Sequence, residues 1–160
     1  MQVVINNLIV NYIKKGEGQA LILLHGWGAS LESFNLILEK LAENHTVYAL
    51  DLPGFGKTQA PAEAWGVSEY GEFLEAFLEK LQIQKAVFLG HSFGGRILIK
   101  LAVKTPTLFE KLILTGAAGI KTKDNLRKAV FKIVAKIGKT ILKLPGLNFF
   151  YQSSQKKLLL

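Results

Sequence analysis

The stretch FLGHSFGGR, residues 88–96, decides how the rest of the chain is interpreted. It follows directly on the apolar run KAVFLG (85–90), and a short continuous run of this kind is typical of a strand buried on both faces. After it, apolar residues recur with a helical period, at Ile97, Leu98, Leu101 and Ala102. Between strand and helix, residues 90–94 fit G-x-S-x-G, a pattern in which a serine sits on a sharp turn with its hydroxyl exposed. The sequence therefore predicts a nucleophile, Ser92, above the carboxyl edge of a sheet.

The segments on either side of this stretch predict the class of fold. Three more buried strands are indicated by ALILLHG (20–26), TVYALDLPGFG (46–56) and KLILTGA (111–117), and amphipathic helical segments lie between them. Two β-branched runs joined around Asn6-Asn7 favour a β-hairpin at the start. Strands that alternate with amphipathic helices predict an α/β fold with a mostly parallel sheet, to which the hairpin adds antiparallel strands at one edge.

Composition narrows the classes of protein and of site. The 160 residues suit one domain or part of a larger one, and 49% of them are hydrophobic, which is enough for a sizeable core. There is no cysteine, which excludes disulfides and thiolate metal sites, and the three histidines do not cluster with carboxylates, so we expect no metal and no cofactor. The first residues lack the pattern of a signal peptide, and no apolar run approaches the roughly 20 residues of a membrane-spanning helix. We expect a soluble, cytoplasmic protein.

Four segments together resemble the α/β-hydrolase family. They are LLHGWG (23–28), ALDLPGFGKT (49–58), GHSFGGR (90–96) and TPTLFEKLILTGAAG (105–119), and their order and spacing are those of the family's N-terminal half. The resemblance implies the α/β-hydrolase fold with about six of its eight strands present, in residues 1–120. It implies acyl transfer at Ser92, and a serine there argues against relatives with an aspartate nucleophile. We expect a small-molecule substrate with an ester or related carbonyl.

Acyl transfer passes through an oxyanion that two backbone N–H groups typically hold. One donor follows the nucleophile, which here is Phe93, and the resemblance assigns the other to Trp27. Gly26 and Gly28 would let the backbone turn inward around Trp27, and its indole is expected to serve as a pocket wall as well. Four aromatic residues indicate an apolar pocket or plain core packing: Phe34, Phe55, Trp65 and Phe93.

None of the histidines is expected to act as the base for Ser92. By resemblance His25 braces the loops of the substrate pocket, and Asp51 organises a loop rather than serving as the triad acid. His91 should point away from Ser92, and His45 should begin a strand at the opposite edge of the sheet. In this family the triad runs in the order serine, acid, histidine.

After Ser92 the sequence holds only two carboxylates, Glu110 and Asp124, and no histidine. The resemblance places the acid after a seventh strand and the histidine after an eighth, so residues 1–120 are expected to be the N-terminal part of a hydrolase core whose completion is missing. Three explanations stay open, of which the first is favoured: a fragment of a full hydrolase, a second chain that carries the rest, or a shortened relative that lost catalysis. Such a relative would be a small-molecule-binding protein or a degenerate gene product.

The charge of the chain is concentrated in residues 121–160. The net charge is +8, yet residues 1–120 carry 10 Lys/Arg against 11 Asp/Glu, while residues 121–160 carry 10 Lys/Arg against Asp124 alone. Residues 124–143 have the period of a basic amphipathic helix, which by resemblance begins a cap over the active site. Binding to a membrane surface is the alternative. Nucleic-acid binding is not expected, because the lysines lack interleaved aromatic residues.

Overall fold

The computed structural model describes residues 1–117. The basic helix predicted over 124–143 and the cap predicted over 121–160 lie outside these residues.

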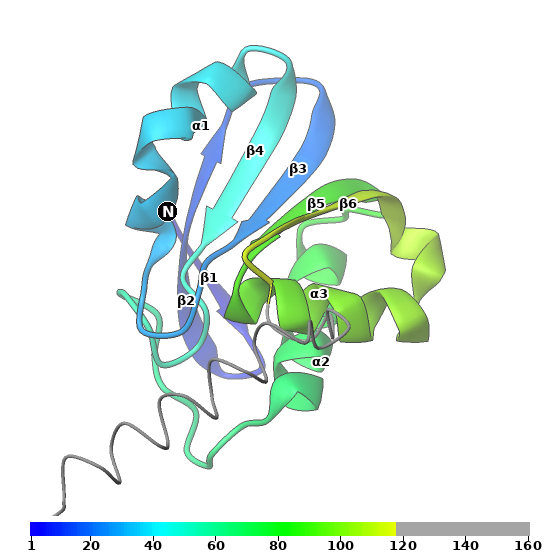
Figure 1. Cartoon of the computed structure of the whole chain (residues 1–160). Coiled ribbons are helices and arrows are strands. Elements are labelled where there is room, and N and C mark those ends of the chain that lie inside the picture. Colours follow the sequence, from blue (N-terminus) through cyan, green and yellow to red (C-terminus); the bar gives the residue numbers. More distant parts are fainter. Residues whose placement is uncertain (118–160) are drawn as a thin grey trace, which may run out of the picture. The chain divides into compact units, whose positions relative to one another are not determined.

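Residues 1–117 build a six-stranded sheet with the order β1-β2-β4-β3-β5-β6 (Figure 1). The strands are β1 (Gln2–Ile5), β2 (Leu8–Lys15), β3 (Gln19–Leu24), β4 (His45–Leu50), β5 (Ala86–His91) and β6 (Phe109–Thr115). The pairs β1–β2 and β2–β4 are antiparallel, and β4, β3, β5 and β6 run parallel. The predicted mostly parallel sheet with an antiparallel N-terminal hairpin is therefore confirmed. At the hairpin turn, Asn6 and Asn7 adopt the positive φ values of 47° and 64° that asparagine tolerates.

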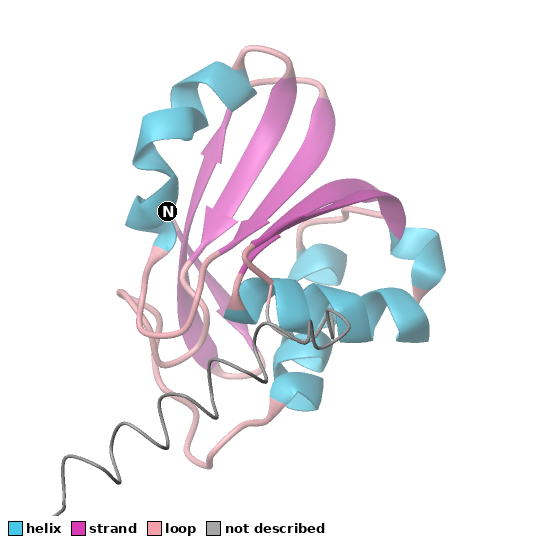
Figure 2. Ribbon diagram, in the orientation of Figure 1, coloured by secondary structure: helices cyan, strands magenta, loops and turns pink. Residues whose placement is uncertain are grey.

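Helices cover both faces of the sheet (Figure 2). The 3₁₀ turn η1 (Leu31–Phe34) leads into α1 (Asn35–Ala42) on one face, while α2 (Val67–Lys80) and α3 (Phe93–Lys104) pack on the other, and a second 3₁₀ turn, η2 (Pro106–Leu108), precedes β6. In β3, Leu21 and Leu23 join the core under α1, and Ile22 and Leu24 join the core under α2 and α3. Burial on both faces explains why this strand is a continuous apolar run.

Parallel pairing brings the carboxyl ends of the central strands to one edge. Leu24, the last residue of β3, lies opposite Gly90 of β5, and His91 lies opposite Thr115 of β6. The loops after β3 and β5, which contain the predicted site residues, therefore leave the sheet side by side. Within residues 1–117, no helix has the length and apolar character needed to cross a bilayer.

Candidate active site

Ser92 occupies a strained turn between β5 and α3. Its backbone has φ 49° and ψ −106°, a combination that a residue with a side chain adopts only where the surrounding structure enforces it. The Ser92 N–H donates to the carbonyl of Thr115 (2.9 Å), and the Gly94 N–H donates to the carbonyl of His25 (3.1 Å). These bonds tie the turn to the ends of β6 and β3. The sharp strand-to-helix turn predicted from residues 90–94 is present.

Two glycines allow α3 to approach the sheet closely enough to form this turn. A Cβ atom on Gly90 would lie 2.7 Å from the Cα of Gly95, and one on Gly94 would lie 2.4 Å from the carbonyl oxygen of Leu24. Both separations are too short for real side chains, and in each case the obstacle is backbone. The glycine spacing of the motif therefore follows from the close contact of α3 with β3 and from the tight turn itself.

The loop after β3 lies directly beside Ser92. A Cβ atom on Gly26 would lie 3.0 Å from Nδ1 of His91 and 3.4 Å from the Cβ of Ser92, so Gly26 packs directly against the turn that holds Ser92. Gly28 adopts φ 72°, and the Ala29 N–H donates to the carbonyl of Gly26 at 3.2 Å, which closes a tight turn around Trp27. Within residues 1–117 neither the Trp27 N–H nor the Phe93 N–H donates a hydrogen bond. Of the two predicted oxyanion donors, Trp27 thus lies in the loop after β3, and Phe93 is the first residue of α3, directly after Ser92.

A cavity of about 370 Å³ opens at this point, lined by Trp27, Ser92, Phe93 and Arg96. Sequence reasoning identified the first three residues and missed Arg96. The signal was present, because Arg96 follows Ser92 by four positions on a predicted helix, and residues four apart share one helical face.

Aromatic side chains form one wall of the site. The Trp27 side chain is 67% exposed, and its ring meets Phe55 and Phe93 edge-to-face at centroid distances of 5.0 and 5.1 Å. Phe55 and Trp65 line a neighbouring cavity of about 390 Å³ together with Trp27. Of the four aromatic residues, Phe93 thus lines the cavity at Ser92, and Phe55 and Trp65 line the neighbouring one. Phe34 does not take part, because it is buried in the core on the opposite face of the sheet, under α1.

His25 is fully buried and both of its ring nitrogens are occupied. Nδ1 lies 2.8 Å from the carbonyl oxygen of Gly26, so it carries the proton, and Nε2 accepts the Leu52 N–H at 2.9 Å. Burial lowers the pKa of His25, which keeps the ring neutral. His25 therefore braces the loops after β3 and β4, as expected, and has no nitrogen available for Ser92.

The other two histidines are also not bonded to the nucleophile. The ring of His91 lies next to Gly26 and Gly116, and no hydrogen bond within residues 1–117 joins it to Ser92. His45 begins β4 at the amino end of the parallel strands, with Nδ1 3.3 Å from the carbonyl oxygen of Leu41. Among the described residues, no histidine stands where a general base would stand.

Asp51 organises three segments around the site. It is 1% exposed, and its Oδ1 accepts the Leu31 N–H at 2.8 Å. Its Oδ2 accepts the side-chain amide of Asn11 at 2.8 Å and the Lys57 N–H at 2.9 Å. One buried carboxylate thus accepts all three hydrogen bonds, which fixes the loops after β3 and β4 to each other and to β2. This is the loop-organising role that the resemblance implied.

No metal centre is found in the part of the chain that the structure describes, since no three His, Asp or Glu side chains there are grouped so that they could hold an ion. The residues around Ser92 present a hydroxyl, an aromatic wall and two backbone amides that donate no hydrogen bond within residues 1–117. Groups of these kinds can take part in attack on a carbonyl group.

Comparison with known proteins agrees with this geometry. A family model described as the alpha/beta hydrolase fold matches residues 19–149. The uncharacterized protein Rv2715 of Mycobacterium tuberculosis is 37% identical over 109 residues, which are 68% of this chain and 32% of that protein. The 2-hydroxymuconate semialdehyde hydrolase of Pseudomonas sp. CF600 is 30% identical over 123 residues, 74% of this chain and 44% of the relative.

Solved structures show the same similarity. The meta-cleavage product hydrolase CumD superposes with a TM-score of 0.73 at 28% identity, over 77% of this chain and 47% of CumD. The matched part of the chain thus spans less than half the length of each of these three proteins.

Proposed function

The chain belongs to the α/β-hydrolase family, as its four motifs predicted, and we propose that it carries the nucleophile of a serine hydrolase acting on ester or related carbonyl substrates. The observation that carries the proposal is the backbone of Ser92. Its φ of 49° is a costly conformation, which strand-to-helix turns of this family use to expose the nucleophile. The loop of Gly26 lies against it, and an aromatic cavity opens above it.

The proposed reaction is two-step acyl transfer. Ser92 attacks the substrate carbonyl while a base takes its proton, and the N–H groups of Trp27 and Phe93 hold the oxyanion that forms. Each such donor contributes about 3 kcal/mol to the stability of the transition state in enzymes of this type. The leaving group departs with a proton, and water then releases the acid from the serine.

The acid and the base are the parts that the described residues do not supply. His25 has both nitrogens engaged, and the sequence has no histidine after His91. We therefore place the acid and the histidine in further core, in a longer form of this chain or in a separate chain that completes it. Residues 121–160 would then begin a basic cap, and contact of residues 124–143 with a membrane surface is the less favoured role.

The substrate is proposed to be a small molecule with an apolar group. Trp27, Phe55 and Phe93 supply an aromatic surface next to Ser92 for such a group. One relative is named for a semialdehyde substrate, which contains a carbonyl group. The absence of cysteine from the sequence agrees with a cytoplasmic location, which is part of the proposal. We propose no nucleic-acid partner.

A second candidate is a small-molecule-binding protein without catalysis on the same scaffold. It is favoured by one observation, that no histidine in residues 1–117 is hydrogen-bonded to Ser92. In this case the cavity would retain its ligand and the serine would stay unreactive.

Reaction with a fluorophosphonate distinguishes the two candidates. The genomic DNA is sequenced past the codon of Leu160, and both the 160-residue chain and any longer form, or a neighbouring complementing chain, are expressed. We expect the completed protein to be labelled at Ser92, as mapped by mass spectrometry, and the 160-residue chain to react at least 100-fold more slowly. The Ser92→Ala variant is the control. A completed protein that contains the expected histidine yet is not labelled would contradict the serine-hydrolase proposal and support the binding protein.

A further inference from the structure

Arg96 lines the cavity at Ser92, here called the serine cavity, but has no role in the proposed reaction. It lies on the first turn of α3, its side chain is exposed, and its N–H donates to the carbonyl of Ser92 at 3.2 Å. Within residues 1–117 the ion pairs are Lys15–Glu39, Lys40–Glu43, Lys85–Glu110 and Lys104–Glu75. The guanidinium of Arg96 is therefore not paired with a carboxylate in the described part of the chain.

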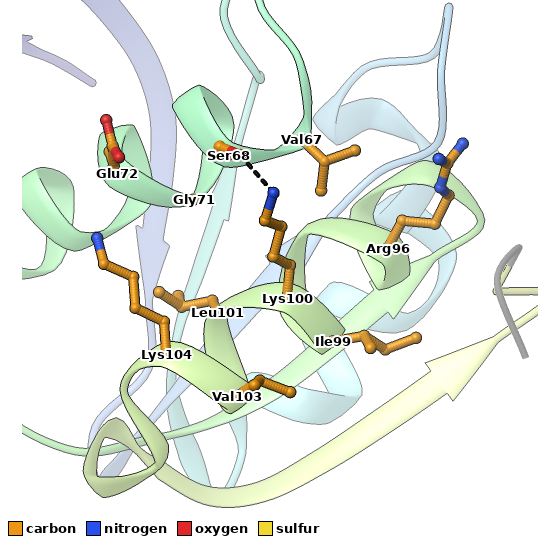
Figure 3. A pocket seen from close by; sticks show the side chains of 10 residues that line it. All are labelled: Val67, Ser68, Gly71, Glu72, Arg96, Ile99, Lys100, Leu101, Val103 and Lys104. Atoms are coloured by element: carbon orange, nitrogen blue, oxygen red, sulfur yellow. Dashed lines mark hydrogen bonds between the residues drawn. The ribbon is translucent and has the colours of Figure 1, made fainter.

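A larger groove extends from Arg96 along α3. Its volume is about 700 Å³, and it lies between α2 and α3 (Figure 3). Arg96 lines both this groove and the smaller serine cavity, so its side chain borders both spaces. Four residues of α-helix rise by about 6 Å, which sets the separation of Ser92 and Arg96 along the helix axis.

Positive charge in the groove is concentrated at the end next to Ser92. Arg96, Lys100 and Lys104 follow one another at intervals of four on α3, and all three line the groove. In Figure 3 the side chains of Lys100 and Lys104 extend toward α2, while that of Arg96 extends beyond the start of α2. At the far end Lys104 is neutralised by Glu75 at 2.7 Å, and Glu72 also lines the groove there. Lys100 instead donates to the neutral hydroxyl of Ser68. Near Ser92 the cations thus have no acidic counterpart among the described residues.

This arrangement opposes helix stability. Like charges four residues apart repel each other, and a cation in the first turn of a helix is disfavoured by the helix dipole. A bound anion between Arg96 and Lys100 would relieve both effects. A guanidinium is also the side chain best suited to hold a carboxylate or phosphate through two parallel hydrogen bonds.

We propose that Arg96 determines substrate specificity by binding an anionic substituent, a carboxylate or a phosphate, located about one helical turn from the carbonyl that Ser92 attacks. This inference rests on the proposed function and deepens it, since it names the class of substrate. Lys100 assists as a second cation in the groove, while Lys104 takes no part because Glu75 already neutralises it.

Ligand binding read from Trp27 fluorescence tests the proposal in the 160-residue chain. The sequence has two tryptophans, so a Trp65→Phe background leaves Trp27, in the serine cavity, as the sole reporter. Three unreactive anilides are titrated: glutarate monoanilide, its methyl ester, and the phosphate monoester of 4-hydroxybutyranilide. We expect at least one of the anions to bind 10-fold or more tightly than the neutral ester, and the preference to shrink as salt is raised. Comparison of the two anions identifies carboxylate or phosphate as the recognised group.

Two substitutions of equal charge locate the effect. Arg96→Gln should reduce the preference for the anion to 3-fold or less, while Lys104→Gln, which removes the same charge from the same helix, should leave it unchanged. Arg96→Lys should retain part of it, which guards against a loss caused by misfolding. The proposal is overturned if the wild-type chain binds all three anilides equally or not at all, if Arg96→Gln keeps the preference, or if Lys104→Gln abolishes it equally.

The outcome is separable from that of the proposed function. Fluorophosphonate labelling of Ser92 in the completed protein does not depend on an anion. If the protein is labelled but shows no preference for an anion, the role of Arg96 in specificity is refuted and the serine-hydrolase proposal stands.

Discussion

Replacing Gly94 with alanine should separate α3 from the sheet and destabilise the fold. Gly94 is the second residue of α3, and an added Cβ would lie 2.4 Å from the carbonyl oxygen of Leu24 and 2.7 Å from its carbonyl carbon and Cβ. Ordinary contacts begin at 3.4 Å, so helix and strand must move apart by about 1 Å. Leu24 cannot easily move, because β3 is paired with β4 on one side and β5 on the other.

The size of the effect follows from two opposing contributions. Overpacking an interior typically costs about 1–3 kcal/mol, and the upper end applies because the obstacle is backbone of the central strand. Alanine in place of glycine recovers less than about 1 kcal/mol of helix propensity at the start of a helix. We expect the free energy of unfolding to fall by about 2 kcal/mol. Ser92 should move with α3 away from Gly26, and its reaction with fluorophosphonate in the completed protein should slow.

Gly71→Ala is the matched control. Gly71 lies inside α2, and a Cβ added there would meet no atom within 4 Å. The same substitution should therefore raise the free energy of unfolding by about 0.5–1 kcal/mol. Urea denaturation followed by circular dichroism measures both variants. The packing argument is wrong if Gly94→Ala is as stable as the wild type, or if the two variants change stability in the same direction.

Two further predictions concern Ser92 and His25. Ser92→Gly should be more stable to urea than Ser92→Ala by about 1–3 kcal/mol, because glycine adopts φ 49° without strain and alanine does not; equal stability of the two variants would mean that the turn stores no strain. Burial lowers the pKa of His25 from its ordinary value of 6.5, so the unfolded chain takes up this proton first. The stability that neutral His25 provides should be fully present above about pH 6.5 and be lost as the pH falls below it. Thermal denaturation between pH 7.5 and 5 should show a shallower loss in His25→Asn, and identical slopes would exclude this contribution of His25.

The fold was largely predictable because its central strands are recognisable in the sequence. β3 and β5 are buried on both faces, so their sequences are continuous apolar runs, and the G-x-S-x-G pattern fixes the turn that follows β5. Strand β6 begins at Phe109, two residues before the start of the strand predicted over 111–117. Phe109 joins it because its ring packs on Phe88 at a centroid distance of 4.2 Å, a tertiary contact that the local pattern does not reveal.

The parts of the site that depend on backbone turns were predictable from the sequence. The parts that depend on how side chains pack were less predictable. The glycine at 26 and the turn at Ser92 follow from the motifs. Phe34 follows the alternative of plain core packing, because it lies in η1 and packs under α1, on the face of the sheet opposite α2 and α3. Arg96 was missed because its interest comes from two cavities that its side chain borders, and only the three-dimensional arrangement shows them.

The three bonds made by Asp51 have a consequence for how this scaffold can be altered. Because one carboxylate anchors the loops after β3 and β4, lengthening either loop between its anchor and its strand would pull the other out of place. Residues 62–64 are exposed and lie between Gln59, whose backbone and side chain are hydrogen-bonded to Ile9 of β2, and the start of α2. Yet their segment borders the cavity that contains Trp27 and Phe55. Insertions at 62–64 should therefore change the entrance to the site while the hydrogen bonds of Asp51 keep the loops around Ser92 in place.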